Sequence, residues 1–323
     1  MRLFVINLSL VLLVLITGFS CSSSRQTDSK TREIDDQPQI VVPDTFVLPL
    51  IPEILTSSGD RVKYLVMHFW DRFDFADKKL IERPEITEQA FVDYINILNF
   101  APKEKVTESL LYTLDKSKAD RAMYLHFASL FEKYFYDPNS PFRNEEYYLP
   151  VLKEVIQSPL LTDVLLSRYE FQLEMTMKNR VGQRAVDFTY TVASGQSYTL
   201  HNLKSEFTLL IFSNPGCPTC EAVTAHLDNS KSLNDALQMN SPTRTMLTIL
   251  TIYPDDDQEE WMAYLPQMPD KWVHGYDNEM EITNKKLYDI KAIPTLYLLD
   301  KDKNVILKDT SIEAVESFFS VND

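Results

Sequence analysis

Residues 207–220 of the 323-residue chain read Phe-Thr-Leu-Leu-Ile-Phe-Ser-Asn-Pro-Gly-Cys-Pro-Thr-Cys. The first six form a short apolar run, typical of a strand that is covered on both faces of a sheet. The Asn-Pro-Gly stretch at 214–216 breaks this strand, and Cys217 and Cys220 follow directly. The residues from Glu221 to Leu227 favour a helix. The sequence therefore predicts a pair of thiols on a strand-to-helix turn.

The predicted turn gives the two cysteines different chemistry. Cys217 falls at the N-terminus of the helix, where unpaired backbone N–H groups and the helix dipole stabilise a thiolate. Pro218 suits the first helical position, because its missing N–H is not needed there. Cys220 lies one turn along, where it can attack a mixed disulfide formed at Cys217 and release the product. This arrangement indicates thiol–disulfide exchange.

Short strands and helices alternate on both sides of this turn. A turn at Ser194-Gly195 separates two of the strands. The alternation predicts a sheet with helices on both faces. The strands are expected at residues 188–192, 198–200, 207–212, 243–253, 295–299 and 305–307, and the helices after Cys217 and at 258–265, 281–290 and 312–319.

Three other uses of a C-x-x-C pair fit the sequence less well. Zinc needs two further ligands, and His226 and His274 make a poor set, so we expect no metal and no organic cofactor. A structural disulfide across two residues would remove little entropy from the unfolded chain. A peroxidase would need a hydroxyl three residues before its thiol, where Asn214 precedes Cys217 and Cys217 itself precedes Cys220.

A second motif makes the pattern more specific. Residues 292–297 read Ala-Ile-Pro-Thr-Leu-Tyr, which places Pro294 at the start of a predicted strand. With the dithiol, this resembles the thioredoxin-like family, in particular the membrane-anchored thiol–disulfide oxidoreductases of the bacterial envelope, over residues 184–323. The resemblance implies that Pro294 is cis and lies against the dithiol, and that the backbone of Ile293 pairs with a substrate strand.

The same resemblance implies the partners and the direction of the chemistry. The substrates would be envelope proteins with thiols or disulfides, served by a redox partner protein, with a weak preference for reduction. The chain departs from the family pattern at four places near the dithiol. Ile211 replaces a buried carboxylate that accepts a proton from the second thiol, and Ser213 and Gly216 replace tryptophans. The pair Pro218-Thr219 replaces Gly-Pro, so the redox potential does not carry over.

The segment 45–180 has a helical pattern instead. Phe91, Tyr94, Ile95 and Leu98 recur at helical spacing, as do apolar residues in the later helices. Prolines punctuate the segment, which we interpret as an all-α domain of five or six helices whose aromatic stripes form the core rather than a ligand groove. It resembles a domain of unknown function that precedes thioredoxin-like modules in bacterial lipoproteins.

The N-terminus resembles a lipoprotein leader. An apolar run follows Met1-Arg2, and small residues lead to Cys21. We expect a signal peptide at 1–20, lipidation at Cys21, a disordered tether over 21–44, and a periplasm-facing chain held at the cell envelope. Two alternatives stay open: an uncleaved anchor helix, and ordinary cleavage with Cys21 merely nearby.

The net charge of −15 argues against nucleic acid as a partner and against membrane binding through a basic face. Membrane association must therefore come from the N-terminal anchor, which we expect to be a lipid on Cys21. The sequence leaves two functions: a thiol–disulfide oxidoreductase, and a non-enzymatic binding lipoprotein in which the thioredoxin-like domain is a scaffold.

Overall fold

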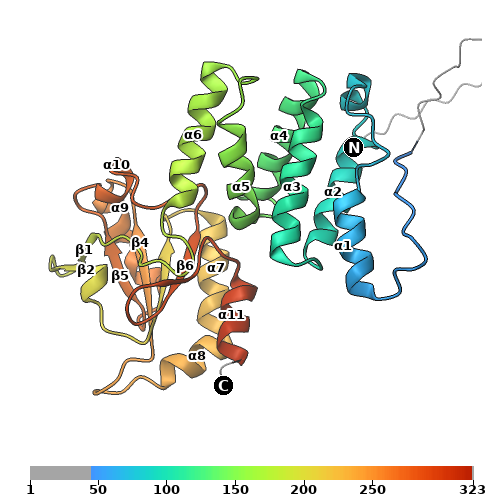
Figure 1. The fold of residues 1–323 in the computed structure, drawn as a ribbon. Helices are drawn as coiled ribbons and strands as arrows, with labels where there is room; N and C mark the ends of the chain where they lie inside the picture. The colour runs from blue at the N-terminus through green and yellow to red at the C-terminus, as the bar shows by residue number, and fades with distance from the viewer. Residues whose placement is uncertain (1–44, 322–323) are drawn as a thin grey trace, which may run out of the picture. The chain divides into compact units, whose positions relative to one another are not determined.

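The computed structural model describes residues 45–321 (Figure 1). The predicted signal peptide, the lipidation at Cys21 and the tether over 21–44 lie outside the described residues. Among the helices described, none is both long and apolar enough to span a lipid bilayer.

The first part of the described chain is helical, as predicted. Four of its α-helices begin at a side-chain cap, supplied by Ser57, Asp120, Asn144 and Thr162, each of which accepts a hydrogen bond from the first helical turn. The helices are α1 (Ser58–His68), η1 (Lys78–Glu82), α2 (Thr87–Leu98), α3 (Lys103–Ser117), α4 (Arg121–Phe135), α5 (Glu145–Val155) and α6 (Asp163–Met177), where η1 is a 3-10 helix.

Aromatic rings fill the core of this helical domain. Trp70 packs edge-on against Tyr94 and Phe127, with ring centroids 5.6 and 5.1 Å apart. The Tyr94 hydroxyl lies 2.6 Å from the hydroxyl of Ser109, which in turn donates to the carbonyl of Val66 at 2.7 Å. The buried phenol is therefore hydrogen-bonded rather than stranded in the core. The predicted aromatic stripes are core packing.

The second part of the chain forms one mixed sheet of seven strands, in the order β2-β1-β5-β4-β3-β6-β7. Strand β3 pairs in parallel with β4 and antiparallel with β6. The strands are β1 (Thr189–Val192), β2 (Ser197–Thr199), β3 (Phe207–Phe212), β4 (Leu247–Tyr253), β5 (Val273–Tyr276), β6 (Thr295–Leu299) and β7 (Val305–Leu307). The accompanying helices are η2 (Leu200–Asn202), α7 (Pro218–Asn229), α8 (Lys231–Gln238), α9 (Gln258–Tyr264), η3 (Leu265–Gln267), α10 (Glu281–Asn284) and α11 (Ile312–Val321).

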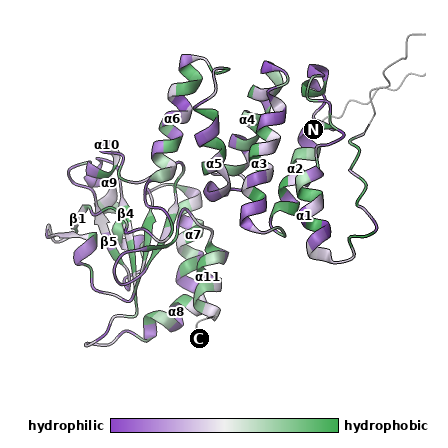
Figure 2. Ribbon diagram, in the orientation of Figure 1, coloured by the Kyte–Doolittle hydropathy of each residue, from purple (hydrophilic) through white to green (hydrophobic). Residues whose placement is uncertain are grey.

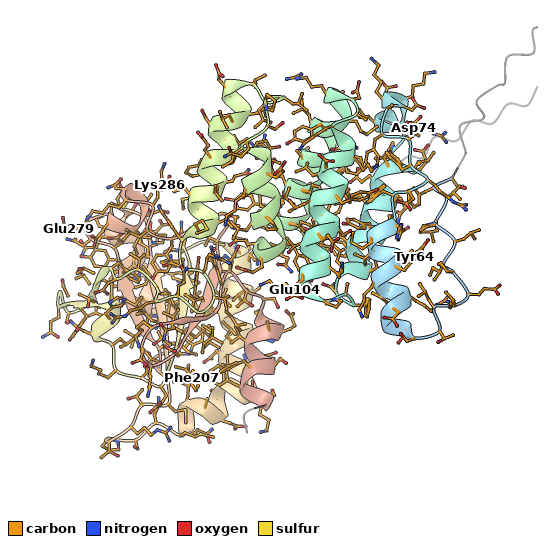
Figure 3. The ribbon with its side chains drawn as sticks, in the orientation of Figure 1. Tyr64, Asp74, Glu104, Phe207, Glu279 and Lys286 are labelled. Atoms are coloured by element: carbon orange, nitrogen blue, oxygen red, sulfur yellow. The ribbon has the colours of Figure 1, made fainter. Side chains whose placement is uncertain are left out.

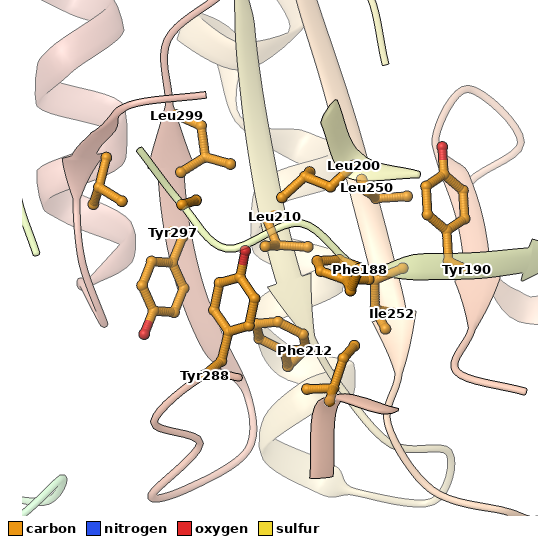
Figure 4. Packing of buried hydrophobic residues seen from close by; sticks show 13 residues of the cluster. Phe188, Tyr190, Leu200, Leu210, Phe212, Leu250, Ile252, Tyr288, Tyr297 and Leu299 are labelled. Atoms are coloured by element: carbon orange, nitrogen blue, oxygen red, sulfur yellow. The ribbon is translucent and has the colours of Figure 1, made fainter. Parts of the chain in front are cut away.

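Alternate residues of the central strands enter two separate cores. Leu209 and Ile211 of β3 pack with residues of α7, α8 and α11 on one face of the sheet. Leu210 and Phe212 pack on the other face, with Tyr288 and the residues shown in Figure 4. Hydrophobic residues accordingly concentrate along the central strands (Figure 2). The predicted fold class is confirmed: a helical domain followed by a sheet flanked by helices.

Two local predictions need correction, and two elements were missed. The helix expected over 281–290 ends at Asn284, because Lys286 has a left-handed φ of +50° and the chain leaves the helix there. The strand expected from residue 243 begins at Leu247, since Ser241 and Arg244 form a turn. Helix α8 and strand β5 were not predicted.

Candidate active site

The dithiol lies where β3 turns into α7. Gly216 adopts a φ of +67°, a left-handed conformation that L side chains rarely adopt. Cys217 is the N-cap of α7, and Pro218 occupies the first turn as the sequence predicted. A tryptophan at 216 would strain this turn, which gives a physical reason for the glycine found there.

The sulfur of Cys217 has two backbone neighbours. The N–H of Cys220 points to Cys217 Sγ at 3.2 Å, so an N–H from the first turn faces the sulfur. The Cys217 thiol donates to the carbonyl oxygen of Ile293 at 3.8 Å. The Ile293–Pro294 bond is cis, as the family resemblance implied. The structure thus brings Cys217, Cys220, Ile293 and Pro294 together.

Sheet register explains this meeting of segments that are 76 residues apart. Phe212, the last residue of β3, pairs with Thr295, the first residue of β6. Because the two strands are antiparallel, the chain that leaves β3 toward Cys217 starts opposite the chain that enters β6 from Pro294. The hydroxyl of Thr295 donates to the carbonyl of Ala292 at 2.5 Å and closes the bend around the cis bond.

Cys220 is more buried than Cys217, and its burial changes its acidity. Only 3% of Cys220 is exposed, whereas Cys217 is half-buried. Burial is the largest cause that raises the pKa of Cys220 to about 12, and its hydrogen bond with Cys217 adds to the rise. At neutral pH Cys220 is therefore a protonated thiol, held behind a more accessible sulfur.

The proton acceptor of the family pattern is absent from its usual place. Ile211 is fully buried among the apolar residues of β3, α7 and α11. Tyr264, at the end of α9, is the titratable group that the sequence analysis missed. Tyr264 lines a small pocket together with Ser213, Asn214 and Pro215, the residues that lead from β3 toward Cys217. Burial raises the pKa of Tyr264, and the negative charge of Glu221 adds to the rise. No pattern in the sequence shows that the end of α9 lies beside the segment that precedes Cys217.

The two histidines considered as metal ligands are occupied elsewhere. His274 Nδ1 lies 2.7 Å from the Thr251 hydroxyl, and its Nε2 lies 3.0 Å from the carbonyl of Pro269. His226 Nε2 lies 3.2 Å from a carboxylate oxygen of Glu316. Residues 45–321 contain no group of three or more His, Cys, Asp or Glu side chains placed to hold a metal ion.

Family models match both parts of the chain. Residues 20–179 match a domain of unknown function, DUF5106, and residues 205–305 match a thioredoxin-like family. The solved structure of a thioredoxin-like protein from Bacteroides caccae is 41% identical, covers 87% of this chain and 100% of its own, and superposes with a TM-score of 0.82. The chain belongs to the thioredoxin-like proteins. Its helical domain is a DUF5106 domain.

Two other similar proteins match a smaller part of this thioredoxin-like chain. The C-terminal domain of an uncharacterized protein from Bacteroides fragilis is 42% identical over 44% of this chain and 98% of its own, with a TM-score of 0.42. Human nucleoredoxin is 28% identical over 123 residues, which are 38% of this chain. The match spans 27% of the length of nucleoredoxin.

The unequal thiols predict selective alkylation. At pH 8 and in the reduced protein, iodoacetamide should modify Cys217 at least about 100-fold faster than Cys220, because only thiolates react and Cys220 is both buried and protonated. Modification of Cys220 should rise about tenfold per pH unit above pH 8, since its pKa lies far higher. Peptide mass spectrometry measures both rates, and the urea-unfolded chain is the control in which both thiols react alike. Equal rates in the folded protein would contradict the assignment.

Proposed function

We propose that this thioredoxin-like protein is a thiol–disulfide oxidoreductase that uses Cys217 and Cys220. The observation that carries the proposal is the placement of Cys217 Sγ, 3.2 Å from a helix N-terminal N–H and 3.8 Å from the carbonyl of Ile293. An accessible sulfur next to an N–H donor is suited to nucleophilic attack as a thiolate. A second sulfur within hydrogen-bonding reach is suited to resolve the product.

The chemistry needs only the two sulfurs of the chain. The Cys217 thiolate attacks one sulfur of a substrate disulfide, which forms a mixed disulfide and releases a substrate thiolate. The Cys220 thiol then gives its proton to that departing thiolate and attacks Cys217 Sγ. The Cys217–Cys220 disulfide forms, the second substrate sulfur leaves as a thiolate that takes its proton from water, and two electrons have passed to the substrate. The reverse sequence oxidises a dithiol substrate.

The environment of Cys220 sets a requirement on the second step. Its raised pKa makes the thiol a poor nucleophile until the proton is removed. Ile211 offers no base, and Tyr264 is itself protonated at neutral pH because its pKa is raised. The substrate thiolate released beside Cys217 is therefore the proton acceptor in this proposal, which couples resolution to the presence of a bound substrate.

Substitution of each cysteine separates the two steps. Cys217→Ser should abolish the dithiothreitol-dependent reduction of insulin, since no nucleophile remains at the helix N-terminus. Cys220→Ser should still attack but should accumulate a mixed disulfide, visible by mass spectrometry as a covalent adduct. The matched control is His226→Gln, a change on the same helix away from the sulfurs, which should keep full activity. Insulin reduction that survives in Cys217→Ser would favour the scaffold function over the enzymatic one.

We further propose that the chain acts at the cell envelope, attached through a lipid on Cys21 and facing the periplasm. The support is the apolar leader ending in a cysteine. Its partners would be envelope proteins with thiols or disulfides and a redox partner protein. Cys21→Ala should move the expressed chain from the membrane fraction to the soluble fraction. Membrane association unchanged by this substitution would contradict the lipid anchor.

A further inference from the structure

The cis bond ends a loop that joins α10 to β6. We call residues 285–294 the proline loop; it carries Ile293, whose carbonyl faces the Cys217 thiol. Within its own domain the loop is held by Tyr288, whose ring is buried in the core and whose hydroxyl donates to the carbonyl of Val186 at 2.6 Å. A substrate strand bound next to the dithiol would contact this loop. The position of the loop therefore affects substrate binding.

A buried cation lies two residues before Ile293. Lys291 is 7% exposed, and its ammonium group contacts Glu145, Asp289 at 2.9 Å and Asp309 at 3.5 Å. It also lies 4.3 Å from the centre of the Tyr136 ring. Burial alone would lower the pKa of Lys291, but the carboxylates, Glu145 foremost, raise it above its ordinary value. A charge this buried is stable only with its partners in place.

The decisive partner comes from the helical domain. Glu145 is the first residue of α5, where the helix N-terminus favours a carboxylate. One of its oxygens contacts Lys291, and the other contacts Lys308 Nζ at 2.7 Å. Lys308 donates in turn to the carbonyls of Thr176 and Lys178 at the end of α6. The Glu145 carboxylate therefore links α5 to the proline loop and to Lys308, the residue after β7, and Lys308 in turn contacts the end of α6.

Further hydrogen bonds from the helical domain reach the same loop. Lys178 Nζ donates to the carbonyl of Lys286 at 2.6 Å, at the position that Figure 3 labels. Asn179 Nδ2 donates to the carbonyl of Leu287 at 2.8 Å. The Tyr136 hydroxyl donates to Asp289 at 3.3 Å. Together with the Glu145–Lys291 ion pair, these contacts fix the loop from one end to within two residues of Ile293.

We propose that Glu145 is a positioning residue for substrate recognition: through Lys291 the helical domain holds Ile293 in register for a substrate backbone next to Cys217. The proposal rests on the thiol–disulfide function above and assigns the helical domain a part in it. An ion pair that only fastened the two domains would affect stability alone. Placement two residues from the substrate-facing carbonyl gives it a consequence for binding as well.

The test compares Glu145→Gln with the wild-type full chain. The KM for insulin should rise about three- to tenfold, the range that one lost hydrogen bond or ion pair produces, while kcat stays within about twofold. Reduction of bis(2-hydroxyethyl) disulfide and alkylation of Cys217 should not change, because these small reagents have no peptide backbone to pair with Ile293. Such a split between protein and small disulfides would not follow from a loss of stability.

The matched control is Glu154→Gln, on the same helix but paired with Lys118, the C-cap residue of α3. This variant should keep the wild-type KM for insulin and for bis(2-hydroxyethyl) disulfide. Tyr136→Phe removes only the hydroxyl next to Asp289, keeps the ring below Lys291, and carries the test if Glu145→Gln does not fold. Its KM for insulin should rise in the same direction.

The outcomes separate the two proposals. A wild-type chain that reduces neither insulin nor the small disulfide overturns the proposed function and this inference with it. A wild-type chain that is active, with Glu145→Gln and Tyr136→Phe at the wild-type KM, overturns the inference alone. An equal rise of KM in Glu154→Gln, or for the small disulfide in Glu145→Gln, also overturns it.

Discussion

The antiparallel pairing of β3 with β6 is the constraint on which the site depends. It aligns Phe212 with Thr295, so the chain segments beyond these two residues must meet. One segment carries Cys217 and the other carries the cis Ile293–Pro294 bond. Neither the helix that follows Cys217 nor the bend at Pro294 would make a site alone. Both strands are anchored by buried side chains on each face of the sheet, which makes the meeting point rigid.

The two sulfurs lie on one helical turn but differ in solvent exposure, and this gives them different chemistry. Cys217 caps the helix and is partly accessible, whereas Cys220 is turned into the protein and loses solvent. Burial raises the pKa of Cys220 to about 12. In the proposed reaction this difference gives the pair an order, because Cys217 attacks first while Cys220 remains a thiol. The isoleucine at 211 strengthens the asymmetry, since it removes a base from the side of Cys220.

Sequence reasoning predicted the parts of the site that local patterns specify. The apolar run of β3, the breaking Asn-Pro-Gly stretch and the proline after Cys217 each have a direct structural meaning, and the elements they predict are present. The bend at Pro294 came from a family resemblance, because most X–Pro bonds are trans and no local signal marks this one. The roles assigned to Cys217, Cys220, Ile293 and Pro294 stay predictions.

The other features of the site depend on tertiary contacts, which cannot be read from the sequence. The helix expected over 281–290 has a helical apolar pattern, yet Tyr288 enters the sheet core and Lys291 meets charges from both domains. Nothing in the sequence distinguishes Glu145 or Tyr264 from other residues of their type. Only the fold places Glu145 against the proline loop and Tyr264 beside the segment that precedes Cys217. The ion pairs of Lys291 join residues up to 146 positions apart, which no periodicity could reveal.

The most direct test of the central claim is a redox titration of the Cys217/Cys220 pair in dithiothreitol or glutathione buffers, read by mass after alkylation. A dithiol that cycles should show one two-electron transition, with a potential between that of a strong reductant, about −270 mV, and that of a strong oxidant, about −120 mV. A pair that stays as two free thiols across the whole range, or that forms no Cys217–Cys220 disulfide, would contradict the account.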